Sequence, residues 1–371
     1  MPGDFVHLHL HTQYSLLDGA NRMKDLLRYV HEQEMPAVAV TDHGNMFGAY
    51  DLQTTAKERR VKPILGVEAY VAPGSRHDRE SVKTFDGEGS NYHLTLLVET
   101  PEGYRNLAQL VSQAFLEGFY YKPRMDWELL ERWHEGIIAL SGCIRGEVSR
   151  RLLADDYEGA KQTALKYHAL FGKDRYFIEL MDHGMPEQRR ILPGLLRISR
   201  ETGIPPVATN DAHYLTRRDS EAQDVLLCIG MGKQLEDQKR MRFYNDEFYV
   251  KSADEMTALF KGHSLEAVSN TVAVAARVEP EAIVYGGLQL PSYPVPEGVG
   301  DADAYLESLA AQGLERLLSA RKEEFATGKS RHPLEEYGTR LKWELSVVKS
   351  LRLSSYFLIV WDFIKLSLIH I

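Results

Sequence analysis

The sequence has very little cysteine and no excess of positive charge. Its two cysteines, Cys143 and Cys228, lie far apart in different sequence contexts, which argues against the disulfide framework of a small secreted protein and favours a reducing cytoplasm. The formal net charge of −9 gives no indication of a broad basic face for nucleic acid. The first residues lack the basic and apolar regions of a signal peptide, so we expect a cytoplasmic protein.

A long hydrophobic run without charges is also missing. The most apolar stretch, residues 354–371, contains Asp362, Lys365 and His370, and each of these is costly at the centre of a bilayer. We therefore expect no membrane span. The 44% of hydrophobic and 26% of charged residues are ordinary for a soluble globular protein. The length of 371 residues allows one large α/β domain of about 250 residues and part of another.

Seven short runs, most of them rich in β-branched residues, predict strands, and segments with helical periodicity lie between most of them. Strands that alternate with helices favour parallel pairing with right-handed crossovers. Polar residues of metal-binding type follow nearly every strand, which favours a barrel over an open sheet. We therefore predict an α/β fold with a distorted, seven-stranded (β/α)7 TIM-like barrel. The predicted strands are Phe5–His11, Ala37–Thr41, Pro63–Glu68, Tyr92–Val98, Gly136–Leu140, Tyr176–Leu180 and Pro206–Thr209.

Nine side chains at the ends of these strands are of types that bind metal. The loops after the strands of a parallel barrel converge at one end, so we expect the nine to meet there. A lone histidine is more often a core or surface residue, but His-x-His, Asp-His-Gly and Asp-x-His all fall at strand ends here. Imidazole, carboxylate and thiolate together suit zinc, with manganese or iron as alternatives. The nine are His9, His11, Asp18, His43, Glu68, His93, Cys143, Asp211 and His213.

Nine ligands are too many for one tetrahedral ion, which takes four, so the pattern predicts a multinuclear site. His93 departs from the rule because it lies at the start of its strand, and an antiparallel or irregular strand there would reconcile it. Two further residues fit the core better than a site. His7 shares the ligand face of its strand but lies deeper, and Cys228 stands within an apolar run.

The motifs resemble a known family. His9-Leu10-His11-Thr12, followed by Leu17-Asp18-Gly19, and the later Thr41–Gly44 and Asn210–His213, are similar to the polymerase and histidinol phosphatase (PHP) domain. The resemblance is to the version found in bacterial replicative DNA polymerase III alpha subunits of the C family. It covers residues 4 to about 364 and includes 118–124, 224–229, 240–243, 344–349 and 356–362.

This resemblance implies a domain organisation. Residues 1–285 would form the PHP domain with the multinuclear metal site, and residues 286–364 a linker and the mainly helical start of the polymerase palm. Residues 365–371 do not fit the family and would be a non-native tail. The family's glycine-rich phosphate-binding segment and catalytic aspartates come after the end of this sequence. We therefore expect a fragment that does not polymerise DNA, and magnesium for polymerisation would belong only to the full-length parent.

The resemblance also implies three divalent ions and a grouping of their ligands. His9, His11, Glu68 and Asp211 would surround one ion, with Asp18 and His213 close by. Glu68 would bridge to a second ion held by His93 and Cys143, and His43 would belong to a third site with Asp18 or His213. The residues assigned to catalysis are His9, Asp211 and Glu68.

Contacts with DNA are predicted for four further residues. Tyr121, Lys122 and Arg124 combine aromatic and cationic side chains as single-strand binders do, although an ordinary surface loop has the same composition. His183 lies in Asp182-His183-Gly184, which imitates the motif around His43 and would either position substrate or cap a turn.

Three functions remain open. The first is a metal-dependent phosphoesterase acting as a 3′–5′ exonuclease on DNA within a replicative polymerase. The second is a small-molecule phosphatase of the histidinol phosphatase type, which would not need residues 286–364. The third is a structural metal domain that supports the polymerase and docks a separate proofreading subunit. The family implies DNA with a 3′ end, a sliding clamp, a clamp-loader-associated subunit and possible association with the nucleoid.

Overall fold

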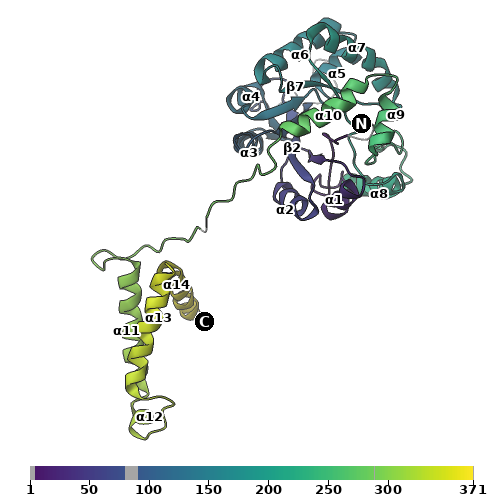
Figure 1. Ribbon diagram of the computed structural model, residues 1–371. Helices are drawn as coiled ribbons and strands as arrows, with labels where there is room; N and C mark the ends of the chain where they lie inside the picture. Colours follow the sequence, from purple (N-terminus) through teal and green to yellow (C-terminus); the bar gives the residue numbers. More distant parts are fainter. Residues whose placement is uncertain (1–4, 80–90, 288, 371) are drawn as a thin grey trace. The chain divides into compact units, whose positions relative to one another are not determined.

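The computed structural model describes residues 5–79, 91–287 and 289–370. It divides into two compact units, Met1–Val284 and Tyr285–Ile371 (Figure 1). Among the described residues, no helix combines the length and the hydropathy that crossing a lipid bilayer requires.

The first unit is built on a curled sheet that confirms the predicted α/β barrel. Its strands follow one another around the curve in the order β1, β2, β3, β6, β7, β8. Residues 5–11 form no continuous strand, but single bridges join His7 to Val38 and Leu10 to Ala212. This segment thereby fills the seventh position between β1 and the end of β8. The bounds are β1 Ala37–Val40, β2 Lys62–Val71, β3 Tyr92–Val98, β6 Ile137–Leu140, β7 Tyr176–Leu180 and β8 Pro206–Ala208.

The strand β3 runs antiparallel to both of its neighbours, β2 and β6, whereas β1–β2, β6–β7 and β7–β8 are parallel pairs. In the β2–β3 register, His93 at the start of β3 lies opposite Tyr70 near the end of β2. The reversal therefore brings His93 to the same end of the sheet as the C-terminal ends of the parallel strands. An antiparallel strand at this position is one of the two arrangements that the sequence analysis gave to reconcile His93 with the other ligands.

A short hairpin that the sequence did not predict extends the sheet beside β2. Its strands are β4 (Phe119–Tyr120) and β5 (Lys122–Met125), and β5 pairs in parallel with the end of β2, with Arg124 opposite Tyr70. Tyr121 connects them with a φ of 58°, in the left-handed region that non-glycine residues adopt at a cost. The hairpin places Lys122 next to the mouth of the barrel.

Helices pack around the sheet, and one of them closes its far end. α10 contributes Val274 and Ala275, and the residue after it contributes Val278, to a cluster with Val6 and Ile64 inside the barrel, at the start of the parallel strands. The C-terminal ends of those strands are left for polar side chains. The helices are α1 Met23–Glu32, α2 Ala49–Arg59, α3 Pro101–Leu116, α4 Trp127–Trp133, α5 Glu147–Leu153, α6 Tyr157–Phe171, α7 Pro186–Thr202, α8 Ser220–Met231, α9 Ala253–Phe260 and α10 Leu265–Arg277.

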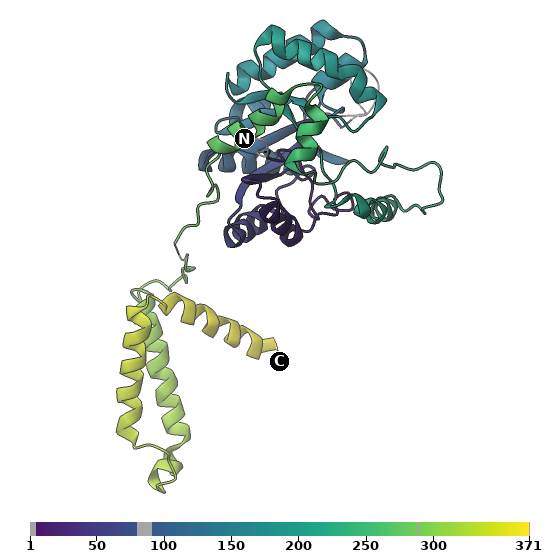
Figure 2. The same cartoon turned by 45° about the vertical axis from the view of Figure 1, so that its right-hand side comes forward.

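A loop of residues 232–247 follows α8 and extends beyond the barrel (Figure 2). Its position is fixed from two sides. The Arg240 guanidinium donates two hydrogen bonds to the Asp224 carboxylate on α8, one of them at 2.6 Å between Nη2 and Oδ2. The ring of Phe243 packs against Phe248 with 4.5 Å between centroids.

The second unit is helical, with α11 (Ala302–Ala320), α12 (Lys322–Ala326), α13 (Leu334–Ser350) and α14 (Ser354–His370). α11 contacts both α13 and α14, and Tyr305 meets Trp361 with 6.3 Å between ring centroids. Residues 365–370 continue α14, while the assignment of 365–371 to a non-native tail stays a prediction and residue 371 lies outside the described residues.

Candidate metal centre

The nine predicted ligands come together at one end of the barrel. Alternation along residues 5–11 points His9 and His11 the same way, β2 contributes Glu68, and β8 leads into Asp211 and His213. Most of their side chains are buried: His9 and His11 have no exposed surface, whereas Asp211, His43 and Asp18 retain 14%, 17% and 28%. The remaining members are supplied by loops at the same end and by the start of β3.

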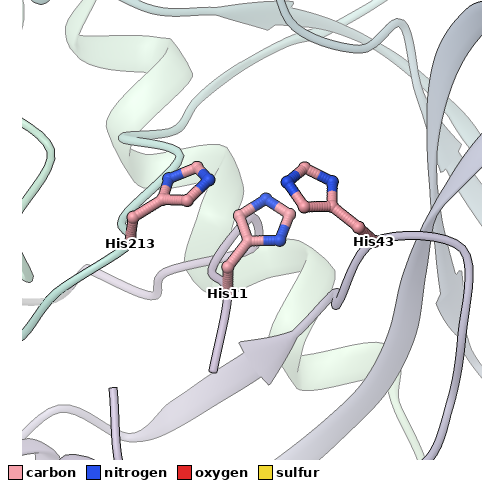
Figure 3. Close-up of side chains that lie close together, drawn as sticks. All are labelled: His11, His43 and His213. Carbon is pink, nitrogen blue, oxygen red and sulfur yellow. The ribbon is translucent and has the colours of Figure 1, made fainter. Parts of the chain in front are cut away.

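Among the described residues, three groups can be formed in which the ligand atoms of each group lie within 4.8 Å of one another. They are His11, His43 and His213; His9, His11 and Asp211; and Glu68, His93 and Cys143. Figure 3 shows the first group, with His11 between His213 and His43. The rings of His11 and His43 stack with 4.0 Å between centroids, and those of His11 and His213 with 4.3 Å. Asp18 joins through a 3.0 Å contact between its Oδ2 and His43 Nε2.

Several of these atoms are buried and have no hydrogen-bond partner among the described residues. They include the Nε2 atoms of His9 and His11, Glu68 Oε2 and Asp211 Oδ1. His11 Nε2 and Asp211 Oδ1 are only 3.0 Å apart. Buried polar atoms are nearly always paired, and a group of orphans needs an explanation such as an ion. Imidazole, carboxylate and thiol groups are also the donors that zinc and similar divalent ions take. The residues therefore fit divalent metal ions.

The electrostatics of the cluster also favour a cation. Burial lowers the pKa of His11 to about 3, so its ring is neutral and able to donate a lone pair. Burial opposes ionisation of Glu68, but His93 and His43 outweigh it and hold the pKa of Glu68 well below its usual range. Burial and then the Glu68 charge raise the pKa of the Cys143 thiol well above its usual value. A metal ion would replace the proton on that sulfur.

Glu179, which the sequence analysis did not single out, supports His9. Nδ1 of His9 lies 2.7 Å from Glu179 Oε1, and the hydroxyls of Thr209 and Thr95 donate to the same carboxylate at 2.7 and 3.2 Å. A carboxylate behind a metal-binding histidine fixes its tautomer and orientation. The available signal was a glutamate in the middle of the otherwise apolar strand β7.

A second support lies behind His11. Nδ1 of His11 is 3.1 Å from Ser15 Oγ, and that hydroxyl donates to Asp42 Oδ1 at 2.7 Å. The backbone N–H of Thr12 donates to the same oxygen at 2.7 Å. The two central histidines are thus both held by buried carboxylates, one directly and one through a hydroxyl.

A cavity of about 410 Å³ opens above the cluster. Besides candidate ligands and Phe248, its lining includes further cationic, aromatic and methionine side chains. They are Tyr70, Lys122, Arg145, Met181, Met185, Met241, Arg242, Phe243 and Tyr244. The cavity has room for a substrate-sized group in contact with the candidate metal ligands.

Two of the four predicted DNA contacts are corrected by the structure. His183 is buried, and its ring nitrogens lie 2.8 Å from the Asn210 carbonyl and 2.8 Å from the Gln188 amide. Arg124 is buried and donates to the carbonyls of Gly118, Arg76 and Asp78. Both were predicted from their charge or motif, but the polar atoms of both side chains already have hydrogen-bond partners within the protein.

The other two DNA candidates are accessible. Tyr121 is 80% exposed at the tip of the β4–β5 hairpin. Lys122 lines the cavity, with its Nζ 5.3 Å from the centre of the Tyr70 ring. Their contact with DNA stays a prediction.

His7 and Cys228 are both buried, in agreement with the expectation that they belong to the core. Nε2 of His7 lies 2.8 Å from the Lys251 carbonyl.

Comparison with known proteins places this geometry in a family. The PHP domain family matches residues 7–183, and the bacterial DNA polymerase III alpha NTPase domain family matches residues 304–369. A DNA polymerase III subunit alpha from Treponema pallidum is 43% identical over 366 residues, which cover 99% of this chain and 30% of that protein. One from Borreliella burgdorferi is 40% identical over 368 residues, covering 98% and 30%.

This chain therefore spans about 30% of the length of these curated relatives. Among solved structures, an amidohydrolase from Chromobacterium violaceum aligns over 56% of this chain and 87% of its own, with 17% identity and a TM-score of 0.34. A similarity this weak supports no argument about function. The matches along both units agree with each other, and the chain belongs to the bacterial DNA polymerase III alpha family, with a PHP domain in its first unit.

Proposed function

We propose that the first unit is a metal-dependent phosphoesterase that acts as a 3′–5′ exonuclease on DNA. The observation that carries this proposal is the convergence of nine ligand-type side chains, with orphaned buried atoms, beneath a cavity that is also lined by Lys122 and Arg145. Clustered metal ligands below exposed cations suit a phosphodiester, because its oxygens carry negative charge.

The three clusters would hold three divalent ions, zinc in our proposal and manganese or iron as alternatives. His9, His11 and Asp211 would hold one, and Glu68, His93 and Cys143 a second. His43, His213 and Asp18 would hold the third. When bound, such ions lower the pKa of a water molecule and stabilise charge on the phosphate oxygens.

The residues we assign to catalysis are His9, Glu68 and Asp211. His9 and Glu68 are buried at the base of the cluster. Glu68 and Asp211 both line the cavity, and Asp211 keeps the larger exposure, so we assign its carboxylate to contact with substrate. Burial opposes ionisation of Asp211, but His9 and His213 outweigh it and hold its pKa well below the usual range. An ionised carboxylate at this position is suited to hold a divalent ion and to accept a hydrogen bond from the attacking water.

The test is a nuclease assay on 3′-labelled single-stranded DNA with and without a chelator. The wild-type protein should remove nucleotides from the 3′ end, and His9→Ala and Asp211→Ala should abolish this while the barrel stays folded. His332→Ala, at an exposed histidine of the second unit, is the matched control. Activity that survives both site substitutions would make the metal centre structural.

The structural alternative has one observation in its favour, the complete burial of His9 and His11. In that case the centre would stabilise the barrel and the domain would dock a separate proofreading subunit. A small-molecule phosphatase is disfavoured because the chain continues into a unit similar to the polymerase family.

We also infer, from the relatives, that the whole protein is a DNA-directed DNA polymerase. It would work with a sliding clamp, a clamp-loader-associated subunit and a separate proofreading exonuclease. The nine ligands include a thiolate, unlike the all-oxygen sites that magnesium favours. We therefore expect no nucleotide incorporation by this chain on a primed template with magnesium and all four triphosphates. Reproducible primer extension would contradict the assignment.

A further inference from the structure

We propose that the cavity binds one nucleotide unit in a fixed orientation, with its phosphodiester against Lys122 and Arg145 and its base against Phe243 and Tyr244. This deepens the proposed function and rests on it, because it names the subsites by which a nucleic-acid end would be recognised.

Ring contacts place Lys122 and Phe243 at opposite ends of the histidine cluster, and the Arg145 carbonyl accepts a hydrogen bond from the N–H of His93 at 3.1 Å, at the Lys122 end. Lys122 lies over Tyr70, and the Tyr70 ring is 6.3 Å from His43 and 5.1 Å from His93, between centroids. At the other end, Phe243 meets the ring of His213 at 4.8 Å. His11 stands between His43 and His213 (Figure 3). The line from cation to aromatic ring therefore passes over the candidate metal ligands.

Two exposed cations lie at the cationic end of the cavity. Lys122 and Arg145 are exposed and line the cavity, and neither has an ion-pair partner among the described residues. Arg242 also lines the cavity, but its Nη2 donates to the carbonyls of Leu235 and Asp237 at 2.7 and 3.1 Å. It braces its own loop, so we do not assign it to the phosphate. Cations without partners attract phosphate oxygens and form strong charge-assisted hydrogen bonds with them.

The opposite end offers flat and polarisable surface instead of charge. Phe243 is half-buried, and Tyr244 is 59% exposed beside it. Met241 and Met185 line the same cavity. The loop that carries Phe243 and Tyr244 is tied to α8 by the Arg240–Asp224 ion pair, so the aromatic surface is held in place. Nucleobases stack on aromatic side chains with little dependence on sequence.

The two ends together favour one class of substrate. A free phosphate or a simple monoester would use only the cations, whereas a nucleotide would use both ends. Stacking of one base on an aromatic side chain changes affinity by about tenfold or more. We therefore expect the protein to prefer an oligonucleotide with a normal 3′-terminal base over the same oligonucleotide with an abasic 3′-terminal nucleotide.

The experiment measures two quantities for these two oligonucleotides. One is kcat/KM for 3′-end hydrolysis by the zinc-loaded protein, and the other is equilibrium binding by fluorescence anisotropy in the presence of chelator. Phe243→Leu keeps packing against His213 while removing the aromatic ring, and Tyr244→Ala removes the exposed ring. Both should lower binding and kcat/KM about tenfold for the normal end and less than about twofold for the abasic end.

The cationic end is tested by the double variant Lys122→Ala/Arg145→Ala. It should weaken binding of both oligonucleotides to the same extent, because the phosphodiester is common to them. Matched controls are Lys57→Ala and Arg28→Ala, which remove exposed cations elsewhere in the first unit, and Tyr356→Ala, which removes an exposed ring of the second unit.

The outcomes separate this inference from the proposed function. Equal loss for both oligonucleotides in Phe243→Leu and Tyr244→Ala would overturn the base subsite, since those rings would then act only through the metal centre. Equal wild-type binding of the two ends would overturn it as well. A clear binding preference without any hydrolysis by wild-type protein would leave the subsites standing and refute the exonuclease proposal.

Discussion

At the scale of single residues, the metal centre depends on side chains that would not touch a metal. Glu179 accepts hydrogen bonds from two threonine hydroxyls and lies 2.7 Å from the Nδ1 of His9. This leaves the Nε2 of His9 directed at Asp211, 3.4 Å away. The orientation of the ring, and with it the shape of the site, follows from this buried carboxylate.

Replacing Glu179 by Gln should weaken metal binding by about 10–100-fold, as loss of such a support commonly does. The amide keeps the size of the side chain but is a weaker acceptor for the His9 ring. Competition with a coloured chelator measures the effect. Glu281→Gln, at an exposed glutamate paired with Lys57, is the control. Unchanged metal affinity in Glu179→Gln would show that His9 is held by packing alone.

Metal affinity should fall as the pH falls, and Cys143 should account for part of the slope. Burial and the neighbouring Glu68 raise the pKa of its thiol, so at neutral pH the sulfur carries a proton that a metal must displace. Metal binding is then tighter at higher pH, where displacing the proton from the thiol costs less free energy. Cys143→Ala should reduce the dependence by one proton, measured by chelator competition over a pH series near neutrality.

The control is Cys228→Ala, because Cys228 is also buried but lies on α8. A slope that stays the same in Cys143→Ala, or that changes equally in Cys228→Ala, would remove the thiol from the site.

The candidate ligands were predictable from the sequence because each stands at a strand end or in a short motif beside one. Glu179 and Asp42 were not, because the sequence does not show which inward-facing polar residue lies behind which ligand. His183 and Arg124 show the opposite error. Their residue types suggested DNA contacts, but their polar atoms are used by backbone carbonyls and the Gln188 side chain of the protein itself.

At the scale of elements, six of the seven predicted strands are present, and two differences have physical causes. Residues 5–11 share their hydrogen bonds between two neighbours: Ala39 N–H donates to the His7 carbonyl, and His11 N–H donates to the Ala212 carbonyl, each at 2.8 Å. No continuous ladder forms with either neighbour. The hairpin β4–β5 contains Pro123 and no β-branched residue. Its sequence therefore gives no strand signal, and the strands are recognised only from the pairing of β5 with β2.

Arg124 should be important for the stability of this hairpin. Its guanidinium is buried and donates to carbonyls of Gly118 and of residues 76 and 78. Arg124→Ala leaves the carbonyls of residues 76 and 78 without this donor and opens a cavity, so we expect a loss of roughly 2–4 kcal/mol in the free energy of unfolding. Urea denaturation measures it. Lys122→Ala, two residues away but exposed, should stay within about 0.5 kcal/mol of wild type.

At the scale of the whole molecule, the chain joins a barrel with a deep polar centre to a separate helical unit. The barrel and its class of metal site followed from strand order and ligand spacing. The assignment of the second unit to a polymerase family followed only from resemblance, because amphipathic helices occur in many folds. The PHP match in the first unit and the polymerase match in the second unit support these two assignments.

Metal analysis of protein purified without chelator should show more than one equivalent of zinc or a similar ion per chain, and close to three after reconstitution. The reason is that three groups of ligand atoms are present and one tetrahedral ion takes only four donors. Mass spectrometry under native conditions and elemental analysis measure the ratio. A maximum of one ion per chain, with active protein, would reject the three-ion assignment.

The bridge between Leu10 and Ala212 has a consequence for biosynthesis. The ribosome makes residues 5–11 long before residue 212, so their second neighbour is not yet present when they are synthesised. Pairing between segments so distant in the chain is slow, because the loop between them must lose its freedom before the contact forms. His9 and His11 meet Asp211 and His213 only at that moment. In the proposed metal centre, uptake of the ion would therefore be a late event in the maturation of the nascent chain, because the ligands of residues 9–11 and 211–213 would have to meet first.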